Sequence, residues 1–152
     1  MKKIVLLGVF LIGIFTIYWY LNHPLAPKVT IRNHTWLLEL AISPEEKERG
    51  LGYRDRLAPE RGMLFIYDHK EQFSFWMKGM RFPLDFIWID GATIVDITKN
   101  VPVDPHSINP KILAPTRTYR PAVAVDKILE LNAGAVDTFG IAIGDTVEFS
   151  DK

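Results

Sequence analysis

The sequence predicts an α+β protein with a mainly antiparallel sheet, two short helices and one transmembrane helix before the sheet. Three observations favour this class. An apolar segment opens the chain, β-branched and aromatic runs are separated by turn residues such as Asp90-Gly91, and helix-capping signals occur at two places. With 152 residues, the chain has room for one domain and an appendage.

The apolar opening segment covers residues 4–21, where Thr16 is the polar exception. As a helix, this segment would be about 27 Å long, which spans a bilayer. Lys2 and Lys3 precede it, and positive charge in this place predicts a cytoplasmic N-terminus. We therefore expect the chain to bind the membrane through residues 4–21.

This reading divides the chain into a signal anchor over residues 1–22, a linker over 23–27 and an extracytoplasmic, β-rich domain over 28–152. The protein is then a single-pass protein of the cytoplasmic membrane. A cleaved signal peptide is the alternative, but no small-x-small pair occurs, and Pro27 would directly follow a cut after Ala26. A buried core helix is a third interpretation, although the chain is too short to surround one.

The first half of the domain contains the clearest helix start. Ser43 is a good N-cap, and Glu46, three residues later, completes a capping box. With Pro44 in the first turn, the pattern predicts a helix to about Leu51 that Gly52 ends. Strands are predicted over Val29–Ile42, as a pair turning at Asn33-His34, and over Met63–Tyr67, Phe73–Met77, Leu84–Ile89 and Thr93–Ile97. In the segment from Phe73, strand alternation puts Phe73, Phe75 and Met77 on one face, which we expect to be core, and Ser74, Trp76 and Lys78 on the other.

Prolines dominate residues 99–121, which hold five of the ten prolines and cannot form a regular central strand. We expect a long structured loop there, followed by a strand over Ala122–Leu131. Asn132 can cap a short helix over Ala133–Phe139. A last strand pair is expected over Ile141–Phe149.

Balanced charge and missing residue types exclude several classes of function. Lys and Arg number 18, as do Asp and Glu, so no basic excess indicates nucleic-acid binding. Without cysteine, the chain has no disulfide, thiolate nucleophile or thiolate metal site. The four histidines lack metal-ligand spacing and no phosphate-binding loop appears, so we expect neither a metal nor a cofactor.

Six sequence blocks occur in the order in which a known family carries them. They are Pro44-Glu45-Glu46 with Glu48-Arg49-Gly50-Leu51, Arg61-Gly62-Met63-Leu64-Phe65, Phe75-Trp76-Met77-Lys78, Pro83-Leu84-Asp85, Leu129-Glu130-Leu131-Asn132-Ala133-Gly134, and Ile143-Gly144-Asp145. In these blocks the chain resembles the domain of unknown function 192 family. The resemblance implies a small, exported or membrane-anchored domain with a compact, barrel-like sheet and no assigned activity.

The resemblance also marks a set of structural motif positions, which are Ser43, Glu46, Arg49, Arg61, Gly62, Pro83, Asp85, Gly134, Gly144 and Asp145. The chain departs from the commonest family pattern after Lys78. There, Gly79-Met80-Arg81-Phe82 replaces a more usual polar Asn-Thr pair, and the proline-rich loop lacks the cysteines that some members carry.

Asp85 and Glu130 are the candidates for acid–base chemistry. Strand alternation would put Asp85 at the edge of the core, where a carboxyl group can act as an acid or base. A hydrolase would need a second carboxylate, such as Glu130 or Asp126, about 5 to 9 Å away. The alternative is that Asp85 accepts backbone hydrogen bonds and orders the loop after Pro83. Glu130 could also form a structural ion pair with Arg61.

Aromatic residues supply a candidate ligand-binding surface. Trp76, Phe86 and Trp88 could form a platform edged by Lys78 and Arg81, on which a sugar ring stacks. The alternative is that these rings belong to the core or lie under a loop, as most aromatic clusters do.

Three functions follow from these patterns. The leading hypothesis is a membrane-anchored binding or accessory module for envelope glycan or for an envelope protein. The second is a hydrolase that uses Asp85 as acid or base. The third is a structural module that contacts membrane proteins through the proline-rich loop.

Overall fold

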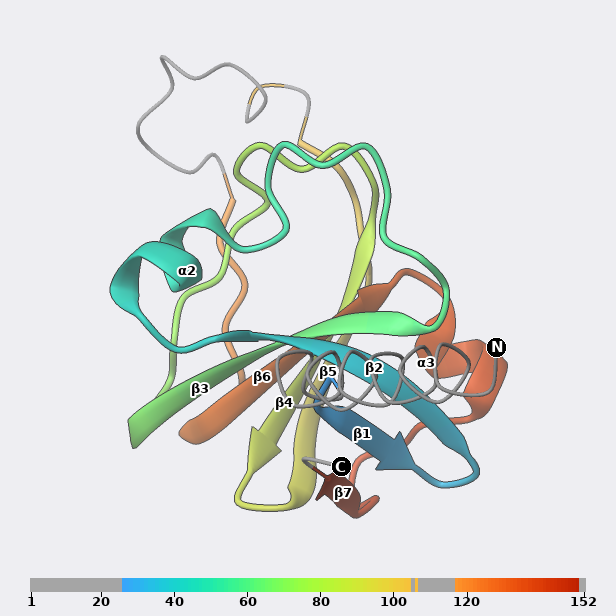
Figure 1. Ribbon diagram of the computed structural model, residues 1–152. Coiled ribbons are helices and arrows are strands. Elements are labelled where there is room, and N and C mark those ends of the chain that lie inside the picture. Colours follow the sequence, from blue (N-terminus) through green and yellow to red (C-terminus); the bar gives the residue numbers. More distant parts are fainter. Residues whose placement is uncertain (1–25, 105, 107–116, 151–152) are drawn as a thin grey trace, which may run out of the picture.

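The computed structural model describes residues 26–104, 106 and 117–150, which form one curved sheet of seven strands (Figure 1). The strands are β1 (Lys28–Ile31), β2 (His34–Ala41), β3 (Arg61–Glu71), β4 (Leu84–Asp90), β5 (Thr93–Val101), β6 (Val125–Asn132) and β7 (Val147–Ser150), and the helices are α2 (Pro44–Arg49) and α3 (Ala135–Phe139). The strand order is β5-β4-β6-β3-β2-β1-β7, and the sheet curls into a half-barrel.

Neighbouring strands are antiparallel except β2 and β3, which run parallel. A parallel pair needs a crossover connection, and α2 with the loop behind it supplies one between Ala41 and Arg61. The predicted α+β class with a mainly antiparallel sheet is thus confirmed. The predicted anchor lies outside the described residues; within them, neither α2 nor α3 is long and apolar enough to cross a membrane.

The predicted capping box is present at the start of α2. Ser43 Oγ accepts a hydrogen bond from the Glu46 amide at 3.2 Å, and Glu46 Oε2 accepts one from the Ser43 amide at 2.9 Å. These backbone bonds lower the pKa of the Glu46 carboxyl. The helix ends at Arg49, earlier than the predicted Leu51, because Gly50 takes a φ of 48°.

The segment Phe73–Met77 is not a strand, contrary to the prediction. Both edges of β3 are already occupied by β2 and β6, so the segment finds no free strand edge beside it. It packs on the face of the sheet and pairs only through an isolated bridge between Phe75 and Tyr119. Its predicted alternation is nevertheless correct, since Phe75 and Met77 are buried and Ser74 is exposed.

Two further predictions near the C-terminus are wrong. Residues 141–149 yield β7 alone, because the Asp145 carboxylate accepts from the Ala142 amide at 2.8 Å and closes a turn before it. Asn132 ends β6 instead of capping α3, which begins after the left-handed Gly134 without a side-chain cap. The other predicted strands are present with shifted ends.

Apolar side chains pack against both faces of the sheet and form two cores. The α2-side core contains Leu84, Phe86 and Trp88 of β4, together with Leu51 behind α2. The α3-side core contains the alternate residues of β4 and Val136 of α3. Because β4 lies inside the sheet and both faces of the sheet are covered, its side chains are buried on both faces. Strand alternation along β4 therefore does not separate a buried face from a solvent-exposed one.

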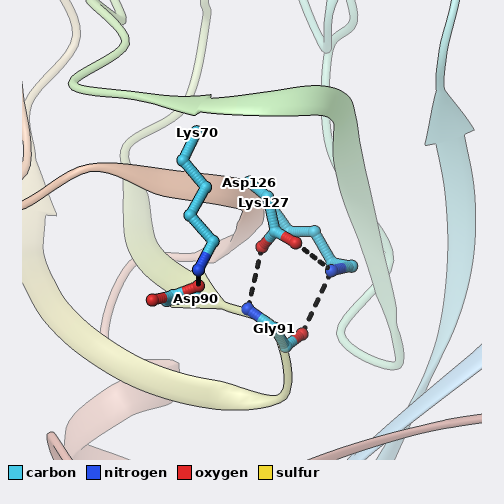
Figure 2. A network of polar contacts seen from close by, with 5 residues as sticks. All are labelled: Lys70, Asp90, Gly91, Asp126 and Lys127. Carbon is cyan, nitrogen blue, oxygen red and sulfur yellow. Dashed lines mark hydrogen bonds and ion pairs between the residues drawn. The ribbon is translucent and has the colours of Figure 1, made fainter.

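The turn between β4 and β5 is tied to β6 by the polar contacts drawn in Figure 2. Asp126 Oδ1 accepts from the Gly91 amide at 2.9 Å, and Lys127 Nζ donates to the Gly91 carbonyl at 3.1 Å and to the Asp126 carboxylate at 2.8 Å. Lys70 of β3 pairs with Asp90 at 2.5 Å. Asp126 is therefore engaged in holding a turn.

Candidate functional site

A pocket of ≈ 80 Å³, here called the α2 pocket, opens between α2 and residues 74–80. Its walls come from parts of the chain that are distant in sequence. They include Lys47, Glu48, Arg49, Gly52, Phe65, Tyr67, Phe75, Trp76, Lys78, Met80 and Glu130. A recess of ≈ 250 Å³ beside it shares Glu48, Arg49 and Lys78 with the pocket. The two hollows therefore adjoin each other next to α2.

Four of the sequence blocks that carry the family resemblance supply lining residues of this pocket. Arg49 belongs to the first block, Phe65 to the second, Trp76 to the third and Glu130 to the fifth. These blocks are distant from one another in the sequence and lie on separate elements. The fold brings them to one place, which makes the α2 pocket the leading candidate site.

Close backbone contact holds the two walls of the pocket together. A Cβ atom on Gly52 would lie 2.9 Å from the Lys78 carbonyl oxygen and 3.0 Å from the Arg49 carbonyl oxygen, so only glycine fits there. The Tyr53 amide also donates to the Gly79 carbonyl at 2.7 Å. The end of α2 and the 74–80 segment are thereby fixed relative to each other.

Glu130 is the buried carboxyl group of the α2 pocket. It lies on β6 between Met63 of β3 and Phe86 of β4, and 5% of its surface is exposed. Its Oε2 atom has no hydrogen-bond partner among the described residues. Burial raises the pKa of this carboxyl to about 8, against a smaller opposing effect of Arg54. At neutral pH the group is mostly protonated and can donate a hydrogen bond.

Neither arginine near Glu130 neutralises it by direct contact. Arg54 forms a bidentate ion pair with Glu39 of β2, at 2.7 and 2.9 Å, which lowers the pKa of Glu39. Arg61 is exposed at the start of β3, whereas the Glu130 carboxyl is buried. The ion pair predicted between Arg61 and Glu130 is therefore absent from the described contacts.

Positive side chains dominate the mouth of the α2 pocket. The Lys47 ammonium lies 4.1 Å from the centre of the Tyr67 ring, and the Lys78 ammonium lies 4.9 Å from the centre of the Trp76 ring. Lys78 also contacts the carboxylate of Glu48 at 3.3 Å. The Glu48 side chain is 71% exposed, so that pair is weak. Glu45 is a second acidic residue in the adjoining recess.

The predicted aromatic platform does not exist as one surface. Phe86 and Trp88 are fully buried in the α2-side core, where the Trp88 indole donates to Thr98 Oγ1 at 3.0 Å. They are buried because β4 is covered on both faces. Arg81 is paired with Asp55. Of the predicted ligand-binding residues, Trp76 and Lys78 alone line the α2 pocket.

Asp85 lies on the opposite face of the sheet from Glu130. In the register of β4 with β6, Asp85 is paired with Leu131 of the α3-side core, whereas Glu130 is paired with Phe86 of the α2-side core. The Asp85 carboxylate accepts hydrogen bonds from two backbone amides at 2.7 and 2.9 Å. The structure therefore does not bring Asp85 and Glu130 together. Asp85 accepts backbone hydrogen bonds, as the alternative expected, but from Asn100 and Val136 and not from the loop after Pro83.

Other motif residues serve the architecture. The Asp145 carboxylate accepts two hydrogen bonds from Arg32, at 2.6 and 3.1 Å, and this contact lowers the pKa of Asp145. Gly144 precedes it with a φ of 93°. The Pro83 carbonyl accepts from the Ala133 amide at 3.2 Å. These positions stabilise turns and strand ends away from the α2 pocket.

Lys47 and Tyr67 are pocket residues that sequence reasoning did not identify. Lys47 lies within the helix of the first resemblance block, where a lysine is ordinarily a solvent-exposed helix position and carries no signal of its own. No local signal marks Tyr67, because its place depends on which strand lies under α2. Over the described ranges, no group of three or more His, Cys, Asp or Glu residues is placed to hold a metal ion.

Comparisons with known proteins agree with the six blocks. The family model for domain of unknown function 192, described as "Uncharacterized ACR", matches residues 27–149. No curated protein matches the chain significantly.

Two solved structures resemble the fold. The first is a proposed transcription regulator from Sinorhizobium meliloti 1021, with 33% sequence identity and a TM-score of 0.71, covering 86% of this chain and 98% of its own. The second is a protein of unknown function from Novosphingobium aromaticivorans DSM 12444, with 28% identity and a TM-score of 0.68, covering 80% of this chain and 83% of its own.

Proposed function

Since the chain belongs to the domain of unknown function 192 family, whose description names no activity, we propose a function that is based on the residues of the α2 pocket. The protein is a binding module for envelope glycan, anchored in the cytoplasmic membrane by residues 4–21, and its α2 pocket accepts one polar, sugar-sized group. The observation that carries this proposal is the buried Glu130 carboxyl in the pocket, whose Oε2 has no hydrogen-bond partner in the part of the chain that the structure describes.

A buried polar atom without a partner costs free energy that the fold must offset elsewhere. A hydroxyl group entering the α2 pocket would satisfy Glu130 and recover that cost on binding. Trp76 supplies a half-buried aromatic wall beside it, and amphipathic rings of this kind stack on the apolar face of sugars. A few polar groups converging on an aromatic wall is the usual composition of a small-molecule site.

The alternatives have less support. A two-carboxylate hydrolase would need both acids on one side of the sheet, and Asp85 and Glu130 lie on opposite sides. An envelope-protein partner would favour a contiguous apolar patch, but within residues 26–104 and 117–150 the exposed large apolar residues come from separate elements: Ile42, Tyr53, Val123, Ile143 and Phe149. Residues 107–116 of the proline-rich loop, through which such a partner was expected to bind, lie outside the described residues. A DNA-binding role like that in the description of the Sinorhizobium protein has little support here, because the chain has no basic excess.

A glycan array probed with the full-length protein in detergent micelles tests the binding function. Wild-type protein should bind at least one envelope-type glycan, and Trp76→Ala should weaken that binding by about tenfold through loss of the stacking surface. Phe149→Ala is the matched control, because it removes an exposed ring on β7, away from the α2 pocket. Folded wild-type protein that binds no glycan, or equal binding by Trp76→Ala, would contradict the proposal.

The anchor is tested separately by membrane fractionation. Full-length protein should remain with the membrane pellet, and protease added outside spheroplasts should degrade the domain after residue 28. Protection from external protease in intact spheroplasts, or recovery of the intact chain in the soluble fraction, would remove the extracytoplasmic part of the proposal and leave the pocket's ligand open to test.

A further inference from the structure

We infer that the group recognised in the α2 pocket is an acidic sugar, whose carboxylate is bound by the cationic mouth while its ring lies against Trp76. This inference rests on the proposed glycan-binding function and specifies its substrate class. It follows from the charges at the mouth, from their partners and from the buried acid behind them.

The first support is the surplus of positive charge at the mouth. Lys47, Arg49 and Lys78 line the α2 pocket together with the exposed acid Glu48, and Glu45 is a second acid in the adjoining recess. A concave surface with more cations than anions attracts an anionic ligand and concentrates it at the site. A neutral sugar would leave this charge without a function in binding.

The second support is that these cations have few ion-pair partners in the protein. Lys78 has one contact with Glu48, at 3.3 Å, and the Lys47 and Arg49 side chains have no ion pair among the described residues. The ring contacts of Lys47 with Tyr67 and of Lys78 with Trp76 hold the ammonium groups over the pocket's aromatic walls. An ammonium group held at the pocket in this way can donate a charge-assisted hydrogen bond to a ligand carboxylate.

The third support is the state of the buried acid. An ionised Glu130 would repel a carboxylate, but a protonated Glu130 donates a hydrogen bond, and no described residue occupies its Oε2. Glu130 is 5% exposed, so it reaches the pocket from the interior and meets only a group that enters the pocket. A carboxylate or an adjacent ring hydroxyl on the same sugar fits this donor.

Titration of full-length protein in detergent micelles with two matched probes tests the inference. Methyl β-glucuronide and methyl β-glucoside differ only in the carboxylate, and the Trp76 indole NH resonance reports binding of either. At low ionic strength the glucuronide should bind about tenfold more tightly. Lys78→Gln should reduce the affinity for the glucuronide to about that for the glucoside, and Glu130→Gln, which keeps a neutral donor, should preserve the preference.

Lys99→Gln is the matched control, because Lys99 is an exposed lysine paired with Asp137 on the α3 side, and it should change neither affinity. Equal affinity for the two probes would overturn the acidic-sugar inference while leaving glycan binding in place. Binding of acetate as tightly as the glucuronide would also overturn it, since the ring would then contribute nothing. Failure of folded protein to bind any of the probes or any arrayed glycan would overturn both proposals.

Discussion

The carboxylate of Asp85 accepts a hydrogen bond from the backbone amide of Val136 at 2.9 Å, joining β4 to the first turn of α3. Its other oxygen accepts from the amide of Asn100 at 2.7 Å, near the end of β5, where Asn100 has a φ of 54°. One fully buried side chain therefore connects three elements. Because the side chain is shielded from water, both backbone donors depend on it for a partner.

Asp85→Asn should destabilise the protein by about 1–3 kcal/mol, because the amide group places an N–H against one of the two backbone donors. Urea denaturation followed by tryptophan fluorescence measures the loss. Asp137→Asn is the control, since Asp137 is exposed in its ion pair with Lys99 and should change stability by less than about 1 kcal/mol. Similar losses of stability for the two variants would show that the buried hydrogen bonds of Asp85 contribute no more than an exposed ion pair.

Glu130 should make the stability of the protein depend on pH. Burial raises its pKa from 4.5 in the ordinary case to about 8 in the folded protein. At pH values between these two, the folded state still holds a proton that the unfolded chain has already released. The free energy of unfolding therefore falls as pH rises through this window, by up to about 1.4 kcal/mol per pH unit, and levels off above it.

Glu130→Gln removes the titrating group and should flatten this dependence, with the largest gain over wild type near the upper end of the window. Urea denaturation at pH values from about 5 to 8 gives both curves. Glu148→Gln, which replaces an exposed carboxyl on β7, should follow the wild-type curve. Parallel curves for wild type and Glu130→Gln would mean that Glu130 is ionised in the folded protein.

The two tryptophans of the predicted platform should respond differently to truncation. Trp88→Ala empties a fully buried site in the α2-side core and should cost about 3–5 kcal/mol. Trp76→Ala removes a half-buried side chain at the pocket and should cost less than about 2 kcal/mol. Thermal unfolding monitored by circular dichroism compares them. A smaller loss for Trp88→Ala than for Trp76→Ala would contradict the burial described here.

Gly62→Ala should destabilise the protein by about 1–3 kcal/mol, because its Cβ would lie 2.7 Å from Leu131 Cδ2 and 3.0 Å from the Glu130 carbonyl oxygen. Shortening the neighbour in the double variant with Leu131→Val should relieve the side-chain part of this clash. The double variant should then lose at least about 0.5 kcal/mol less than the sum of the single losses in urea denaturation. Strict additivity would show that Leu131 is not the obstacle.

Local patterns in the sequence were sufficient for several features. The capping box of Ser43 and Glu46 forms as predicted because it needs only residues three positions apart. The alternation of Phe75 and Met77 also predicted which side chains are buried, although the segment is not a strand. Apolar side chains are buried because this removes their surface from water. Strand pairing also requires a free strand edge, which no local sequence pattern reveals.

The sequence by itself determined the α+β class, the family and the helix start at Ser43, because each rests on residue types at short spacing. Only the tertiary structure decided that β2 and β3 run parallel, that Trp88 is buried on a doubly covered strand, and that Glu130 enters the α2 pocket. These outcomes depend on which strands become neighbours. Neighbour choice minimises the free energy of the whole sheet, and residues far apart in the chain contribute to it together.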